Sequence, residues 1–243
     1  MKYMGSKNRI SKYILPIISK ELDNYTYYIE PFVGGCNLID KVDGIRIGGD
    51  NNSFLISMWK GLQRNEERPY TITKDLYKKA RNEYNHIRKE QEIEREFSDF
   101  MIGWIGWMGS YNGRFFDGGY SGHSVGKTKR DYISEQIRNT ESQIDNIKSV
   151  DFRYSSYENL ILPENSVIYC DIPYKNTKKY STSKDFNYDK FWDWCRVTSS
   201  SDKKIFISEY EAPTDFECVW EKELTNSMNT TKTYKPTEKL FTI

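Results

Sequence analysis

The sequence is poor in the residues that build metal centres and disulfide frameworks. Of its 243 residues, only two are histidine and four are cysteine. The cysteines, at positions 36, 170, 195 and 218, form no Cys-x-x-Cys pair. Because protein zinc sites use clustered Cys and His ligands at short spacings, we expect no metal site. The cysteines are expected to be reduced thiols at buried or half-buried positions.

Long apolar runs are also absent. No stretch approaches the roughly 20 apolar residues that a membrane-spanning helix needs. The segment Met1–Lys7 lacks the apolar core of a signal peptide. These absences predict a soluble intracellular protein.

An excess of one sign of charge is also missing. The 36 Lys and Arg residues nearly balance the 35 Asp and Glu residues, so the net charge is only +1. This balance neither requires nor excludes nucleic acid, because nucleic-acid binders often carry their basic residues in one patch. Aromatic residues are abundant at 15%, which argues against disorder. The length fits one domain with an insertion, or two small domains.

Strands and helices are predicted to alternate at both ends of the chain. The expected strands are residues 26–30, 45–48, 151–154, 166–170, 204–208, and a terminal hairpin of 217–224 with 239–243. The expected helices between them are residues 7–22, 52–63 and 186–196. This alternation predicts an α/β protein with a parallel sheet flanked by helices.

The middle of the chain has a different pattern. Residues 74–100 are expected to form one long, charged and solvated helix, followed by a buried helix at 100–108, a loop at 109–126 and a helix at 131–147. We therefore expect a discontinuous α/β domain of residues 1–54 and 151–243. A mostly helical domain of residues 55–150 interrupts it.

A glycine turn with an acid after the next strand is the first candidate constellation. The glycines of Glu30-Pro31-Phe32-Val33-Gly34-Gly35-Cys36 allow the backbone to approach a ligand at the carboxyl edge of a parallel sheet. Asp50 follows the next strand, where an acid commonly holds the ribose hydroxyls of an adenosyl group. Both features also occur in ordinary turns, so the ligand site is one of two interpretations.

The second constellation is Asp171-Ile172-Pro173-Tyr174, which follows an apolar strand. A carboxylate at a strand end can accept a hydrogen bond from the amine of a planar ring, and Tyr174 can stack on that ring. A simple proline turn with an incidental acid is the alternative.

The third constellation is a loop with positive charge, tyrosine, asparagine and glycine, which suits contacts to phosphates and base edges. A solvated loop without function is the alternative. Its candidate residues are Tyr111, Asn112, Gly113, Arg114, Lys127, Lys129 and Arg130. A further basic run directly follows the Asp171 turn and comprises Lys175, Lys178, Lys179 and Lys184.

In content and order, these motifs resemble the Dam-like DNA adenine-N6 methyltransferases of the Asp-Pro-Pro-Tyr type, bacteriophage members in particular. Asp171-Ile172-Pro173-Tyr174 occupies the place of the catalytic motif. Residues 29–34 are similar to the family's glycine motif, and residues 2–7 to its N-terminal cofactor motif. The helical insertion lies where this group carries its target-recognition region.

The resemblance implies a Rossmann-like methyltransferase fold and S-adenosylmethionine as cofactor, with no metal. The substrate would be an adenine in a short site of double-stranded DNA, methylated in the cytoplasm of a bacterial or phage-infected cell as in restriction-modification systems. The implied catalytic residues are Asp171, Ile172, Pro173 and Tyr174. The implied cofactor contacts are Tyr3, Lys7, Phe32, Gly34, Asp50 and Asp171.

The implied mechanism begins with flipping of the adenine out of the duplex. Asp171 and the carbonyl of Ile172 would accept hydrogen bonds from the N6 amine and localise its lone pair for attack on the methyl group. Two departures from the family pattern bear on activity. Cys36 replaces the usual second glycine and narrows the space near the cofactor, and Ile172 replaces a proline and reduces rigidity.

Three other interpretations remain. A cytosine-C5 methyltransferase needs a nucleophilic cysteine, but strand alternation turns Cys170 away from the site. An RNA or protein methyltransferase is the nearer alternative. A catalytically impaired DNA-binding relative is supported only by Cys36 and Ile172.

Overall fold

The computed structural model describes residues 1–124, 130–175, 186–223 and 237–243. The chain divides into two compact units. The first, which we call the sheet unit, comprises Ile10–Val33, Val42–Asn51 and Ser155–Ile243. The second, the helical unit, comprises Met1–Arg9, Gly34–Lys41 and Asn52–Tyr154.

Six strands of a seven-stranded sheet belong to the sheet unit, in the order β2-β1-β6-β7-β9-β8. Strands β2, β1, β6 and β7 are mutually parallel, and β9 and β8 are antiparallel to their neighbours. The four parallel strands therefore end at one edge of the sheet. The bounds of the six strands are β1 Tyr27–Glu30, β2 Ile45–Asp50, β6 Ser166–Asp171, β7 Lys203–Glu209, β8 Glu217–Glu223 and β9 Thr237–Thr242.

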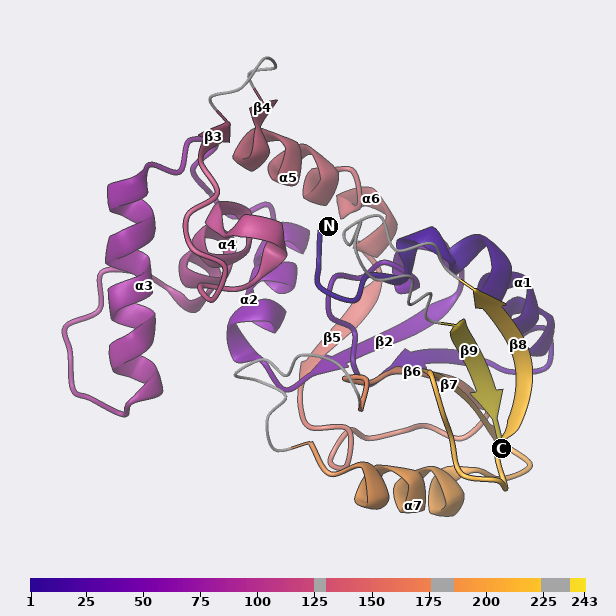
Figure 1. The fold of residues 1–243 in the computed structure, drawn as a ribbon. Helices are drawn as coiled ribbons and strands as arrows, with labels where there is room; N and C mark the ends of the chain where they lie inside the picture. Colours follow the sequence, from indigo (N-terminus) through magenta and orange to yellow (C-terminus); the bar gives the residue numbers. More distant parts are fainter. Residues whose placement is uncertain (125–129, 176–185, 224–236) are drawn as a thin grey trace. The chain divides into compact units, whose positions relative to one another are not determined.

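Helices α1 (Ser11–Leu22) and α7 (Tyr188–Thr198) cover opposite faces of this sheet (Figure 1). The Asn187 side chain caps α7 by accepting the backbone N–H of Lys190 at 3.0 Å. The predicted α/β sheet flanked by helices is confirmed.

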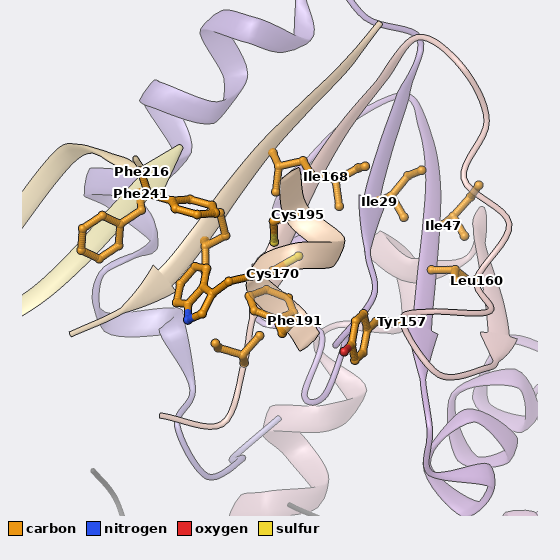
Figure 2. Packing of buried hydrophobic residues seen from close by; sticks show 14 residues of the cluster. Ile29, Ile47, Tyr157, Leu160, Ile168, Cys170, Phe191, Cys195, Phe216 and Phe241 are labelled. Carbon is orange, nitrogen blue, oxygen red and sulfur yellow. The ribbon is translucent and has the colours of Figure 1, made fainter. Parts of the chain in front are cut away.

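The core under α7 follows from the alternation of side chains along the strands. Ile168 and Cys170 of β6 point to the same face, where they join Phe191 and Cys195 of α7 in one buried cluster (Figure 2). Phe191 is fully buried, and truncating a buried phenylalanine to alanine typically costs about 3–5 kcal/mol. This core fixes the position of β6, and with it the residues that follow Cys170.

The helical unit is organised around α4, which contacts α2, α3 and α5 (Figure 1). Its helices are α2 Ser53–Gln63, α3 Lys74–Arg88, α4 Asp99–Gly109, α5 Tyr132–Glu141 and α6 Ile144–Ile147. Its short strands are β3 His123–Ser124, β4 Arg130–Asp131 and β5 Val150–Tyr154. Single turns of 3₁₀ helix are η1 Lys7–Arg9, η2 Ile39–Lys41 and η3 Tyr111–Gly113.

Helix α4 packs against α2 with little side-chain volume between the two backbones. A Cβ atom added to Gly103 would lie 2.3 Å from the carbonyl oxygen of Phe54. Only glycine permits this approach. Although α4 is buried on most of its surface, no helix within the described ranges is long and apolar enough to cross a membrane.

The expected single helix over residues 74–100 is wrong. Helix α3 ends at Arg88, and α4 begins after the cap residue Ser98. The connecting segment returns along α3 because the Glu83 carboxylate accepts the backbone N–H groups of Glu96 and Phe97, at 3.0 and 3.3 Å. These contacts are tertiary, so the charge pattern of the sequence did not indicate them.

The expected helix over residues 131–147 is two helices. Helix α5 ends at Glu141, and α6 begins at Ile144. Gln143 lies between them with its side chain buried and turned to the backbone of another segment, the carbonyl oxygen of Cys36, at 3.0 Å. The Gln143 side chain thus ties the junction of α5 and α6 to the segment that carries Cys36.

Candidate active site

Each of the four parallel strands in the sheet unit ends on an acidic residue. These residues are Glu30, Asp50, Asp171 and Glu209. Because parallel strands end at one edge, their carboxylates share that edge. Antiparallel β9 begins at the same edge and adds Glu238, since Lys239 pairs with Glu209. The carboxyl edge of the sheet therefore carries a row of five acids.

The turn after β6 is anchored from both sides. Ile172 is buried in the cluster under α7, while Asp171 is partly exposed. The carbonyl oxygen of Pro173 accepts a hydrogen bond from the Tyr188 hydroxyl at 2.9 Å. The core thus holds the isoleucine that stands where a proline was expected, while Asp171 remains accessible.

Tyr174 is fixed by its hydroxyl and by its ring. The hydroxyl donates a hydrogen bond to Glu238 Oε2 at 2.6 Å. The ring meets Tyr210 edge to face, with 4.5 Å between centroids and 77° between planes. Burial, followed by the neighbouring carboxylates of Asp171 and Glu238, raises the pKa of Tyr174 well above its usual value. The side chain is therefore a neutral phenol at physiological pH.

Two further buried tyrosines line the same strands. Tyr28 donates its hydroxyl to Glu30 Oε1 at 2.9 Å, and Tyr169 shares a hydrogen bond with Ser208 at 2.7 Å. Burial is the main cause that raises the pKa of both tyrosines. Two of the acids at the edge, Glu30 and Glu238, thus accept hydrogen bonds from neutral phenols.

Phe32 and Asp50 flank this edge on the side of β1 and β2. The Phe32 ring is half-buried and contacts Tyr157, Phe186 and Phe191 at centroid distances of 5.4, 5.9 and 5.9 Å. Asp50 is half-buried, and its backbone carbonyl accepts the N–H of Ser155 at 3.0 Å. The sheet unit therefore places an aromatic ring and an acid along the same sheet edge as the Asp171 turn.

The glycine turn belongs to the helical unit from Gly34 onward. Gly34 has a left-handed φ of 45°, and a Cβ atom there would lie 2.8 Å from the Tyr3 ring. A Cβ atom on Gly35 would lie 2.6 Å from Tyr3 Cβ. Trp59 donates its indole N–H to the Gly34 carbonyl at 3.0 Å. Tyr3 thus lies against the glycine turn, and its side chain leaves no room for a Cβ atom at either glycine.

Cys36 adopts the left-handed conformation with φ of 53° and is fully buried. This conformation costs about 1–2 kcal/mol for a residue with a Cβ atom. The usual glycine at this position is therefore explained by backbone conformation.

Lys7 is 6% exposed. Its Nζ donates a hydrogen bond to the carbonyl of Gly5 at 3.1 Å, in the segment that also carries Tyr3. A lysine is rarely this buried unless it is paired.

The loop predicted to contact nucleic acid is a tight turn. Asn112 and Gly113 both have left-handed φ angles, of 55° and 64°. A Cβ atom on Gly113 would lie 2.2 Å from the carbonyl oxygen of Lys2. The turn leaves Tyr111 exposed, with 49% of its surface accessible.

The basic residues of this region differ in the hydrogen bonds that their side chains form. Within the described residues, Arg114 Nε has no hydrogen-bond partner. Arg130 forms two hydrogen bonds with Glu135, at 2.6 and 2.7 Å, and this contact lowers the pKa of Glu135. The predicted residues Lys127, Lys129, Lys178, Lys179 and Lys184 lie outside the described residues.

Cys170 is fully buried against α7, on the face that strand alternation predicted (Figure 2). Burial raises the pKa of its thiol well above the usual value. A buried neutral thiol is a poor nucleophile, so this position does not suit cytosine-C5 chemistry. Among the described residues, no group of His, Cys, Asp and Glu side chains could hold a metal ion.

Sequence reasoning missed four residues that shape the two units. Glu209 follows a predicted strand as Asp171 does, so the strand-end pattern was available to find it. Tyr210, Glu238 and Gln143 have no local signal, because their contacts depend on long-range pairing.

One comparison with known proteins identifies a family. The model of the family described as D12 class N6 adenine-specific DNA methyltransferase matches residues 3–235. No curated protein matches the chain significantly.

Proposed function

The chain belongs to the D12 class N6 adenine-specific DNA methyltransferase family, and we propose that Asp171 activates the adenine amine for methylation. The enzyme is a DNA adenine methyltransferase of Rossmann-like fold that uses S-adenosylmethionine. The observation that carries the role of Asp171 is its place at the end of β6, partly exposed beside buried Ile172 and Tyr174.

Each unit, taken by itself, carries residues that suit a part of the cofactor. Two crowded glycines leave backbone without side-chain bulk beside Tyr3, and strand-end acids suit ribose hydroxyls and a positive charge. S-adenosylmethionine supplies an electrophilic methyl group when bound. We assign its binding to Tyr3, Lys7, Phe32, Gly34, Asp50 and Asp171.

The chain's own residues then prepare the base. The adenine amine is a weak nucleophile because its lone pair is delocalised into the ring. The Asp171 carboxylate and the Ile172 carbonyl accept hydrogen bonds from that amine, which localises the lone pair on nitrogen. Tyr174 stacks on the flipped base and offsets part of its unstacking cost. Catalysis is then a matter of positioning and electrostatics.

Double-stranded DNA is the proposed partner, bound at a short specific site through residues 55–150. In that region the exposed Tyr111, the turn at Asn112 and Gly113, and Arg114, whose Nε has no hydrogen-bond partner among the described residues, support this assignment. Lys127, Lys129 and Arg130 are assigned to the same surface. Arginine and lysine contacts to phosphates give affinity, and polar side chains at base edges give specificity.

The subtype, the origin and the biological role of the enzyme are part of the same proposal. The motifs at Lys2–Lys7 and Asp171–Tyr174 support a Dam-like subtype and a bacteriophage origin. A phage enzyme of this kind acts in the cytoplasm of the infected cell, and protection from restriction-modification is its proposed role.

The decisive experiment is transfer of labelled methyl from S-adenosylmethionine to unmethylated DNA, followed by nucleoside analysis and mapping of the modified positions. We expect N6-methyladenine at one recurring short site. Label in RNA alone would identify an RNA adenine methyltransferase. Cofactor binding without any transfer would identify a catalytically impaired relative.

A further inference from the structure

Glu209 is a buried acid with no role in the mechanism described above. Only 3% of its surface is exposed. Its Oε1 accepts the backbone N–H of Lys175 at 2.6 Å, and its Oε2 accepts the backbone N–H of Tyr210. Hydrogen bonds to an ionised carboxylate are shorter and stronger than those between neutral groups.

The two bonds lie on either side of one aromatic contact. Lys175 directly follows Tyr174, and Tyr210 directly follows Glu209 in the chain. The rings of Tyr174 and Tyr210 meet at 4.5 Å. One carboxylate therefore fixes both backbone segments that carry this pair of rings, at the point where the β6 turn leaves the sheet.

We propose that Glu209 is a positioning residue for methyl transfer: it holds the Asp171–Tyr174 turn against the end of β7. This inference rests on the proposed function, because it assigns Asp171 and Tyr174 to the adenine. Glu209 acts through the backbone of the turn and does not contact the base. Catalytic groups displaced by about 1 Å can lose about 100-fold in rate, so the anchor matters for turnover.

The proposal requires two acceptor oxygens rather than a side chain of a given size. Glutamine has nearly the shape of glutamate, but it replaces one acceptor with an NH₂ donor that faces a backbone N–H. Aspartate is one methylene shorter yet keeps both acceptors. A purely packing role therefore ranks Gln above Asp, whereas anchoring through acceptors ranks Asp above Gln.

The test compares Glu209→Gln and Glu209→Asp with the full-length wild-type enzyme. Glu217→Gln, an exposed change of the same chemistry in β8, is the matched control. We expect kcat to fall by about 10- to 100-fold in Glu209→Gln, with less loss in Glu209→Asp and none in Glu217→Gln. The KM for DNA and the affinity for S-adenosylmethionine should stay close to wild type.

Amide hydrogen exchange at Lys175 and Tyr210 gives a readout that does not depend on activity. We expect exchange at least about tenfold faster in Glu209→Gln, the equivalent of one hydrogen bond to a charged group. Unchanged kcat in this variant, or Gln performing better than Asp, would overturn the positioning role and leave the proposed function intact. A wild-type enzyme that methylates no DNA would instead overturn the proposed function, while exchange still reports on the anchor.

Discussion

At the scale of single residues, the proposed site depends on Asp171, which ends β6 close to the buried Tyr174 phenol. Tyr174 stays protonated because burial and two carboxylates raise its pKa. The phenol that follows the Asp171 turn therefore carries no charge of its own.

Replacing Asp171 with alanine removes the proposed acceptor. We expect turnover to fall by at least about 100-fold, the scale seen when one transition-state hydrogen bond is lost. Labelled methyl transfer measures turnover, and thermal unfolding checks that the fold is retained. Near wild-type turnover in a folded variant would contradict the role of Asp171.

Tyr174 allows the ring and the hydroxyl to be separated. Tyr174→Phe keeps the stacking ring and loses only the bond to Glu238, so we expect a small decrease in kcat. Tyr174→Ala also loses base stacking, worth about 1–3 kcal/mol, and should lower kcat/KM by about 10- to 100-fold. Steady-state kinetics on the same DNA compares them, and equal losses would argue against stacking.

Cys36 allows a test of backbone strain. Cys36→Gly and Cys36→Ala both remove the sulfur, but only glycine tolerates the left-handed φ without cost. We expect the free energy of unfolding to be about 1 kcal/mol higher for the glycine variant than for the alanine variant. Urea denaturation measures the difference, and a more stable alanine variant would refute the explanation.

At the scale of elements, the contact between α2 and α4 leaves little room for added volume. Gly103→Ala places a methyl group against the Phe54 carbonyl, which forces the helices apart. A Gly-to-Ala change inside a helix usually stabilises by about 1 kcal/mol, but here we expect a loss of about 1–3 kcal/mol.

Urea denaturation of Gly103→Ala measures this loss. Lys78→Ala, an exposed change on α3, is the control and should stay within about 0.5 kcal/mol of wild type. A stabilised Gly103→Ala variant would show that the close approach is not a constraint.

Individual elements of the fold also show which parts of the structure could be predicted from the sequence and which could not. The strand-end acids, the glycine turn and the Asp171 turn are local patterns, so their elements could be expected from sequence. The break after Arg88 could not, because it depends on Glu83 reaching Phe97 across a turn. Glu238 could not either, since its place follows from the pairing of β9 with β7.

At the scale of the whole molecule, the proposed function assigns affinity for DNA and catalysis to different residues. Arg114→Ala should weaken DNA binding and make the dependence of log affinity on log salt shallower by about one. Arg130→Ala should have less effect, because its guanidinium is already bound to Glu135. Fluorescence anisotropy across a salt series measures both variants.

Asp171→Ala provides the complement, since it should bind DNA with wild-type affinity. An Arg114 variant with unchanged affinity at every salt concentration would show that the DNA surface has been assigned to the wrong residues.

The row of acids along the sheet edge bears on how the product of methyl transfer is exchanged for a new methyl donor. The methyl donor carries a positive sulfonium, whereas the product left after transfer has lost that charge. Under the proposed function, an edge with five carboxylates attracts the incoming cofactor more strongly than the spent one. The same field repels phosphate groups. Under the proposed function, the edge therefore favours the exchange of spent cofactor for fresh methyl donor.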